Sequence, residues 1–186
     1  MWEYKKILEY PVKITKPNPR FASQMLTAIG GPGGELAAAI RYFIQAPTMP
    51  DLIGQNTLVE IATEELGHVE ILCAMYRQLT KDASVDEFIN GDANNIFTDH
   101  GYAIYPTDAS GNPFTVTYLA STGDPITDLT EDMAAEEKAR SGYENLMKQT
   151  NDPEILAPLS FLRQREIIHY QRFAEVLKHY QDIKKD

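Results

Sequence analysis

Two copies of a Glu-x-x-His motif constrain the fold of this 186-residue chain more than any other feature. One copy is formed by Glu65 and His68, and the other by Glu166 and His169. Residues three apart on a helix share a face, and both copies lie in segments with helical apolar periodicity. Burying a charge on an apolar face is costly unless a partner or a metal ion compensates it. The two motifs therefore indicate helices that pack around a shared polar centre.

Four long segments with helical periodicity account for most of the chain. Residues 21–46 have apolar side chains at helical spacing, although the glycine-rich run 30–34 should break or kink a helix. A long helix is predicted from about residue 51 to 79. Two more are predicted at about 125–149 and 153–180, and each begins after an aspartate and with a proline at its first position.

The remaining segments are expected to be irregular. Residues 1–20 contain three prolines and form an N-terminal arm, with a short strand predicted at 12–14. Residues 80–124 are rich in Asp, Asn, Gly and Pro, and the alternating stretch 114–118 predicts another short strand. A connection of this length is typical of the crossover in a four-helix bundle. We therefore predict a single all-α domain over residues 1–186, a four-helix bundle with a long crossover between its second and third helices.

The apolar stripe of the predicted helix 51–79 contains the first motif. Its apolar residues recur at the i, i+3, i+4 and i+7 positions, and Glu65 and His68 fall among them. Three other glutamates fall outside the stripe and are predicted to face solvent, namely Glu60, Glu64 and Glu70.

Two further glutamates complete a repeated pattern. Glu35 precedes Glu65 by thirty residues, and Glu136 precedes Glu166 by thirty, which favours Glu136 over its neighbour Glu137. Each half of the chain thus supplies a helix with one glutamate, a turn and a helix with Glu-x-x-His. In helical bundles such residues converge on a dinuclear metal site. One short motif is weak evidence, but the doubled spacing is hard to produce by chance.

The residue types indicate which metals such a site would take. Two divalent ions held close together repel each other, so carboxylates that bridge them are required. Imidazoles complete the ligand shell and leave positions for solvent or substrate. Carboxylate and imidazole without thiolate suit manganese or non-haem iron, and the ligand types do not separate these two metals. The alternative is a bundle whose buried polar residues pair only with one another.

Composition argues against several other classes of function. A net charge of −10 disfavours nucleic acids and anionic membranes as partners. Cys73 is the only cysteine, so neither a disulfide framework nor a thiolate metal site is expected. No apolar run approaches the ~20 residues that span a bilayer, and the N-terminus lacks the apolar core of a signal peptide. These features predict a cytoplasmic location.

Over nearly its whole length the sequence resembles the manganese catalases of the ferritin-like superfamily, and it most resembles their short members, the CotJC-type spore-coat proteins. The resemblance is clearest in four stretches, residues 30–36, 61–70, 134–140 and 165–173. It implies a ferritin-like four-helix bundle that binds two manganese ions per subunit and no haem. It also implies homo-oligomers, hexamers in relatives, which disproportionate hydrogen peroxide to dioxygen and water.

The resemblance assigns roles to individual residues as well. It implies five metal ligands, which are Glu35, Glu65, His68, Glu136 and His169. Glu65 would bridge both ions, and Glu166 would stay in the outer sphere and transfer protons beside a bridging solvent. Tyr42 matches a tyrosine that forms a hydrogen bond near the centre in relatives.

One position departs from the pattern of some relatives. They carry a basic residue immediately before the third-helix glutamate, where this chain has Ala135. Arg140 or Lys138 could substitute as the residue that controls access to the site.

Two other functions are compatible with the same residues. The first is a di-iron ferritin-like oxidase or peroxidase, because iron takes the same ligand types. The second is a structural protein of the spore coat, with other coat proteins as partners and a vestigial metal site. In the second case the chain would be located in the spore coat.

Overall fold

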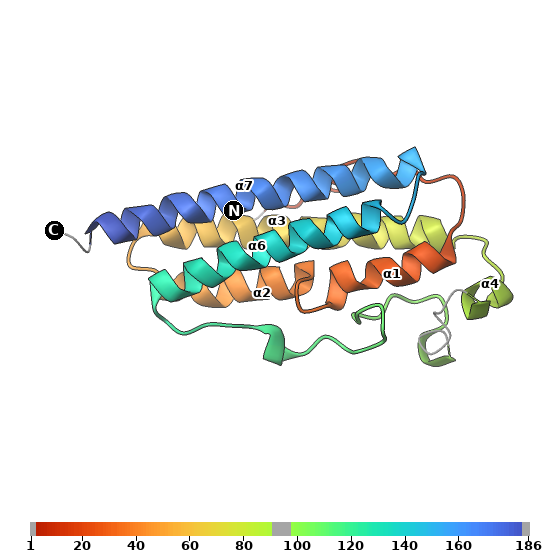
Figure 1. The fold of residues 1–186 in the computed structure, drawn as a ribbon, viewed down its shortest axis with the longest axis horizontal. Coiled ribbons are helices and arrows are strands. Elements are labelled where there is room, and N and C mark those ends of the chain that lie inside the picture. The colour runs from red at the N-terminus through yellow and green to blue at the C-terminus, as the bar shows by residue number, and fades with distance from the viewer. Residues whose placement is uncertain (1–2, 91–97, 184–186) are drawn as a thin grey trace.

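The computed structural model describes residues 3–90 and 98–183, so part of the predicted crossover, residues 91–97, lies outside the described chain. Within the described residues the chain is α-helical and contains no strand. Four helical columns run side by side (Figure 1). The first column consists of α1 (Pro19–Gly30) and α2 (Glu35–Gln45). The other three are α3 (Leu52–Thr80), α6 (Pro125–Met147) and α7 (Pro153–Ile183). The predicted all-α four-helix bundle with a long crossover is confirmed.

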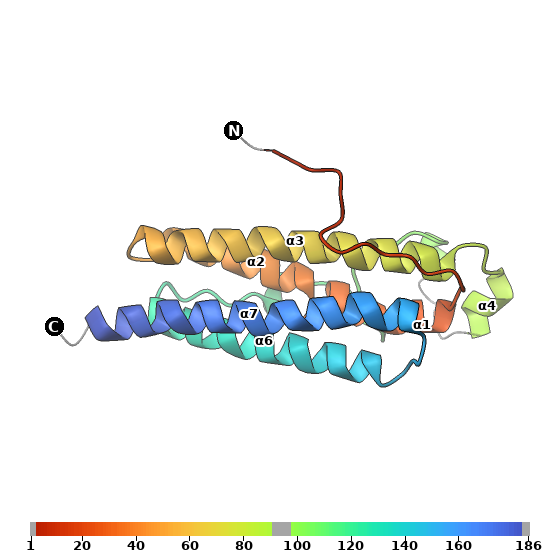
Figure 2. The same cartoon turned by 90° about the horizontal axis from the view of Figure 1, so that it is seen from above.

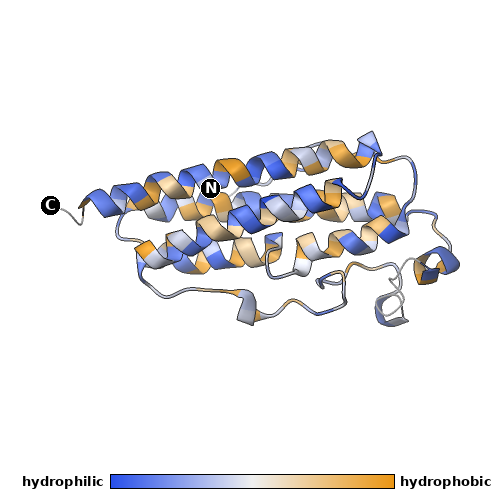
Figure 3. Cartoon of the chain, viewed as in Figure 1, coloured by the Kyte–Doolittle hydropathy of each residue, from blue (hydrophilic) through white to orange (hydrophobic). Residues whose placement is uncertain are grey.

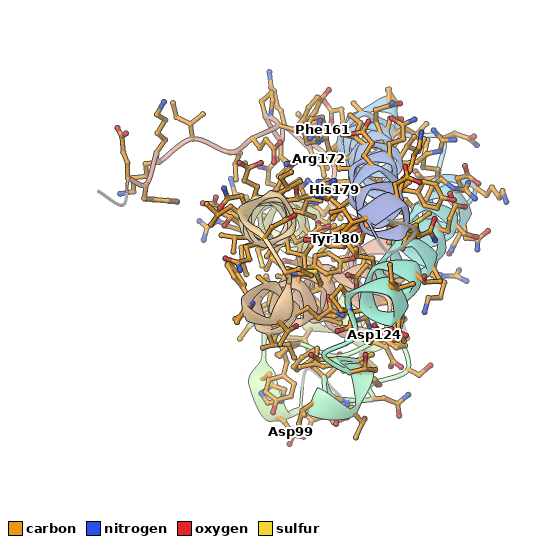
Figure 4. The ribbon with its side chains drawn as sticks, turned by 90° about the vertical axis from the view of Figure 1, so that its left-hand side faces the viewer. Asp99, Asp124, Phe161, Arg172, His179 and Tyr180 are labelled. Carbon is orange, nitrogen blue, oxygen red and sulfur yellow. The ribbon has the colours of Figure 1, made fainter. Side chains whose placement is uncertain are left out.

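The bundle consists of two antiparallel hairpins. In the first hairpin α1 and α2 pack against α3, and in the second α6 packs against α7. The hairpins meet where α3 contacts α7 and where α6 contacts α1 and α2. Viewed end on, the four columns form a square with the crossover along one side (Figure 4). One side of every helix therefore faces a common interior.

Three helices begin at side-chain caps. Asn18, Asp51 and Asp124 each accept a hydrogen bond from a backbone N–H in the first turn of α1, α3 and α6, respectively. Such caps satisfy N–H groups that have no partner within the helix. The predicted helix starts at Pro125 and Pro153 agree with the structure.

The glycine-rich run interrupts the first column, as its low helix propensity predicts. α1 ends at Gly30 and α2 begins at Glu35. A Cβ atom on Gly30 would lie 2.4 Å from the carbonyl carbon of Pro106 in the crossover. One on Gly34 would lie 2.8 Å from the carbonyl oxygen of Thr27. The glycines thus allow backbone segments to approach closely and let a new helix start with Glu35 in its first turn.

Gly30→Ala should destabilise the protein by about 1–3 kcal/mol, because its Cβ atom would overlap the crossover backbone. Gly142→Ala is the matched control, since it lies within α6 and a Cβ atom there would have no neighbour within 4 Å. Alanine should be stabilising at Gly142 by about 0.5–1 kcal/mol through helix propensity. Urea unfolding of both variants measures the difference, and equal effects would contradict the close approach at Gly30.

The crossover returns along the outside of the bundle from the end of α3 to the start of α6 (Figure 1). It includes a short helix, α4 (Val85–Asn90), and a 3-10 turn, η2 (Val116–Tyr118). The predicted strand at 114–118 is therefore wrong. The predicted strand at 12–14 is also wrong, because the Ile14 N–H donates to the side chain of Gln78 rather than to a neighbouring strand.

The N-terminal arm runs along α3 before it turns into α1 (Figure 2). The ring of Tyr10 in the arm stacks on Phe161 of α7, with the ring centroids 4.9 Å apart. The Gln78 side chain of α3 donates to the carbonyl of Val12. The arm therefore contacts both α3 and α7 on the outside of the bundle.

The interior of the bundle contains two apolar clusters separated along the helix axes. On α3, Ala62 belongs to one cluster and Ile71 to the other. On α7, Leu162 and Phe173 are divided in the same way. Both Glu-x-x-His motifs therefore lie between the two clusters, where apolar packing on either side separates them from the ends of the bundle.

The bundle helices carry hydrophilic residues along their whole lengths (Figure 3). Among the described helices, none combines the length and the apolar character needed to cross a membrane.

Candidate metal centre

Six polar side chains converge between the two apolar clusters, and each is at most 2% exposed. All four columns contribute, through Glu35 of α2, Glu65 and His68 of α3, Glu136 of α6, and Glu166 and His169 of α7. Candidate ligand atoms, one from each residue, form two groups among these six residues, and within each group they lie within 4.8 Å of one another. The groups are Glu35, Glu65, His68 and Glu166, and Glu65, Glu136, Glu166 and His169. The structure thus brings together all six residues of the repeated pattern.

Glu65 lies between the two histidines. Its Oε2 atom is 2.7 Å from Nδ1 of His68, and its Oε1 atom is 2.9 Å from Nδ1 of His169. Glu166 is the equivalent residue on α7, and among the described residues its one histidine contact within 4 Å is at 3.8 Å, to Nδ1 of His68. Two carboxylates that are equivalent in the sequence pattern therefore differ in the structure.

Two buried tyrosines connect the hairpins. Tyr42 of α2 donates a hydrogen bond to Glu136 of α6, and Tyr143 of α6 donates one to Glu35 of α2. Sequence reasoning identified Tyr42 and missed Tyr143. The signal was present, because Tyr143 follows Glu136 by seven residues, just as Tyr42 follows Glu35.

The charges of the cluster act on one another strongly. Burial raises the pKa of Glu166 well above its ordinary value, and the carboxylates of Glu35 and Glu65 raise it further. Burial also raises the pKa of Glu35 to about 8. For Glu65 burial acts in the same direction, but His169 and His68 outweigh it and hold the pKa well below its usual range. Without metal, burial and the neighbouring charges therefore favour an anionic Glu65 between the two histidines and favour the protonated forms of Glu35 and Glu166.

Several buried atoms of the cluster have no hydrogen-bond partner among the described residues. They are Oε2 of Glu136, Oε1 of Glu166 and Nε2 of both His68 and His169. Oε1 of Glu65 and Nδ1 of His169 face each other at 2.9 Å but without hydrogen-bond geometry. Unpaired buried polar atoms are costly and call for an explanation. Oxygen and imidazole nitrogen are ligand atoms for manganese and iron. Four buried carboxylates also supply the negative charge that two divalent ions would balance, so the residues fit a dinuclear centre.

A small cavity reaches the centre from the side of α2 and α6. Glu136, Glu166 and Tyr42 line it, together with Arg41 and several small residues. Arg41 is 3% exposed, and its Nη2 atom donates to the carbonyl of Tyr118 in the crossover. Its Nε atom has no partner among the described residues. A buried guanidinium therefore lies at the cavity, and sequence reasoning missed it.

Neither basic residue proposed from the sequence to control access lines this cavity. Arg140 donates instead to Glu137 and Glu144 on the same helix. Lys138 is exposed. Helical spacing on α6 alone could not identify Arg41, because that residue reaches the cavity from α2.

Glu64 does not face solvent as its helical position predicted. Its side chain is 18% exposed, and it accepts a hydrogen bond from Arg165 of α7. Its Oε1 atom lies 3.3 Å from Nε2 of His169 and 3.7 Å from Nε2 of His68. The periodicity of α3 places residue 64 beside the apolar stripe, and the neighbouring α7 then covers it.

Comparison with known proteins gives consistent matches to one family. The family model described as "Manganese containing catalase" matches residues 1–185. Protein CotJC of Bacillus subtilis is 44% identical over 100% of this chain and 99% of its own length. A probable manganese catalase of Clostridium acetobutylicum is 33% identical over 89% of this chain and 74% of its own. The crystal structure of KatB, a manganese catalase from Anabaena, aligns with a TM-score of 0.90 and 33% identity over 97% of this chain and 81% of that chain.

Proposed function

Because the chain belongs to the manganese-containing catalase family, we propose that it disproportionates hydrogen peroxide to dioxygen and water. The observation that carries the proposal is the convergence of four buried glutamates and two buried histidines from all four columns. Their unpaired oxygen and nitrogen atoms are suited to hold metal ions between the two apolar clusters of the interior.

In this proposal two manganese ions per chain are held by Glu35, Glu65, His68, Glu136 and His169. When bound, the metal pair supplies two-electron redox chemistry, by which one peroxide is oxidised to dioxygen and another is reduced to water. Glu65 has one oxygen against each histidine ring, which supports it as the shared carboxylate. Iron is the alternative metal, because the ligand types suit it equally.

Glu166 is the proposed proton carrier. Oxidation of one peroxide to dioxygen releases two protons, and reduction of another to two water molecules consumes two. A buried carboxyl group that accepts a proton and returns it serves both half-reactions. Burial, then the nearby Glu35 and Glu65, raise the pKa of Glu166, so it can hold a proton at neutral pH. Glu166 also lines the small cavity beside the centre.

Tyr42 orients a glutamate on the opposite hairpin. Its hydroxyl group donates to Glu136, and both residues line the small cavity. The buried tyrosine therefore restrains the Glu136 carboxylate without entering the ligand set.

Manganese uptake by the metal-free chain should release protons, and its affinity should rise with pH. Burial opposes protonation of His169, but Glu65 raises its pKa to about 11, and burial raises the pKa of Glu35 to about 8. Both residues hold protons at pH 7 and must lose them to bind a metal. Calorimetric titration with Mn²⁺ in two buffers of different ionisation enthalpy measures the release. An affinity that stays constant between about pH 6 and 8 would contradict this protonation scheme.

The proposed function is tested on full-length protein produced with manganese and iron both supplied. Metal analysis should find two manganese ions per chain, and an oxygen electrode should record one dioxygen for every two peroxides consumed. Iron loading with peroxide consumption but no dioxygen would favour the oxidase or peroxidase alternative. Absence of both metal and peroxide consumption would favour a purely structural role.

A place in the spore coat is a second part of the proposal, and similarity to CotJC supports it. The chain would then assemble as a homo-oligomer beside other coat proteins, and its enzymatic and structural roles would coexist. Detection of the chain in the coat fraction of purified spores tests the location. Its recovery only from the cytoplasm would contradict it.

A further inference from the structure

A constant offset of 101 residues relates the two halves of the centre. The residues that it relates are Glu35 and Glu136, Tyr42 and Tyr143, Glu65 and Glu166, and His68 and His169. At each of these pairs the two residues are identical. The same offset relates Glu64 to Arg165, which immediately precede the two motifs and have opposite charges. The repeat is therefore broken at a position next to the histidines.

The two residues that break the repeat bind each other. Arg165 of α7 donates to Glu64 of α3, and both side chains are about three-quarters buried or more. The rings of His68 and His169 stack beneath them, with centroids 5.6 Å apart and planes inclined by 21°. A single oxygen of Glu64 faces the Nε2 atoms of both rings, at 3.7 Å and 3.3 Å, respectively.

Glu9 of the N-terminal arm is the other carboxylate on this side of the rings. Its Oε2 atom lies 3.7 Å from Nε2 of His68. Among the ion pairs of the described residues, Glu9 has none with His169. Glu64 is therefore the carboxylate that approaches the outer nitrogen of both histidines.

We infer that Glu64 is a positioning residue shared by both histidines and that Arg165 holds it in place. A carboxylate beside Nε2 favours the imidazole tautomer that carries its proton there. The Nδ1 lone pair of each ring is then directed toward Glu65 and the interior. The distances of 3.3 Å and 3.7 Å are those of charge contacts, so Glu64 acts through its field on the N–H groups. The inference rests on the proposed function, because it takes Nδ1 of both rings as metal-binding atoms.

Glu64→Ala in the full-length chain should lower the affinity for Mn²⁺ by about 10- to 100-fold. Glu64→Gln keeps the shape and one acceptor oxygen but removes the charge, so its affinity should lie in between. Glu60→Ala is the matched control and should keep the wild-type affinity. Glu60 also pairs with an arginine of α7, Arg172, but its side chain is 66% exposed and has no histidine contact among the described residues. Figure 4 labels Arg172 on the side of α7 that faces α3.

The charge-exchanged double variant E64R/R165E separates positioning from general stability. The residue at 165 precedes His169 by four positions, as residue 64 precedes His68. A carboxylate at position 165 should therefore serve both rings from the other helix. The double variant should recover most of the lost affinity and the electron paramagnetic resonance spectrum of the manganese pair. The single variant E64R should have neither the wild-type affinity nor the wild-type spectrum.

Competition titration of metal-free protein with a chelating dye measures these affinities, and circular dichroism checks that each variant is folded. Wild-type affinity in Glu64→Ala, or no recovery in a folded double variant, would overturn the inference while leaving the proposed function intact. A wild-type chain that takes up no manganese would overturn the proposed function and the inference together.

Discussion

Glu166→Gln should lower the turnover of hydrogen peroxide by about 10²- to 10⁴-fold, while the chain still takes up two manganese ions. Glutamine has the shape of glutamate but cannot accept and return a proton. Glu166 lines the small cavity, and its nearest histidine contact among the described ion pairs is at 3.8 Å, to Nδ1 of His68. Its loss should therefore affect proton transfer more than metal retention. Initial rates of dioxygen release and metal analysis of the same preparation measure both quantities.

Glu175→Gln is the matched control for this variant. Glu175 lies on the same helix but is exposed, so the substitution should change neither turnover nor metal content. Full turnover in Glu166→Gln would contradict its role as proton carrier. Loss of metal from that variant would instead make Glu166 a ligand.

Glu65→Gln should prevent uptake of both manganese ions. Glu65 has one oxygen against each histidine ring, at 2.7 Å from Nδ1 of His68 and 2.9 Å from Nδ1 of His169. The amide removes the negative charge at the middle of the cluster and turns an N–H donor toward one imidazole. Metal analysis after gel filtration of manganese-treated, metal-free protein measures the loss.

The comparison of Glu65 with Glu166 is sharp because the substitution is identical and the positions are equivalent in the repeat. One variant should keep its metal and lose turnover, whereas the other should lose its metal altogether. If Glu65→Gln kept two ions and Glu166→Gln kept none, the two proposed roles would have to be exchanged.

The six central residues could be located from the sequence because their pattern is one of spacing. The thirty-residue interval recurs in both halves, and the periodicity of α3 and α7 places Glu65 and His169 on inward faces. The repeat also contains Tyr143, but tyrosine is common in helix cores. A role at the centre can be assigned to it only when the acceptor of its hydrogen bond is known. That acceptor is Glu35 on the other hairpin, and periodicity within one helix carries no information about it.

The incorrect or missing predictions arose where a single segment was judged without the segments that pack against it. Glu64 was predicted to face solvent because its position was judged on α3 alone, whereas Arg165 of α7 covers it. The alternation at 114–118 was too short to separate a strand from a 3-10 turn, and no neighbouring strand is present among the described residues to pair with it. Arg41 enters the cavity from α2, a location that only the packing of α2 against α6 determines.

The proposed dinuclear centre draws on both hairpins, and this sets an order of events during biosynthesis. A ribosome that has released α1 to α3 has already exposed Glu35, Glu65 and His68 to the cell. The proposed pair of metal positions is incomplete at that stage, because its ligands Glu136 of α6 and His169 of α7 are still missing. In the proposed enzyme, capture of the complete manganese pair therefore follows translation, once α6 and α7 have docked.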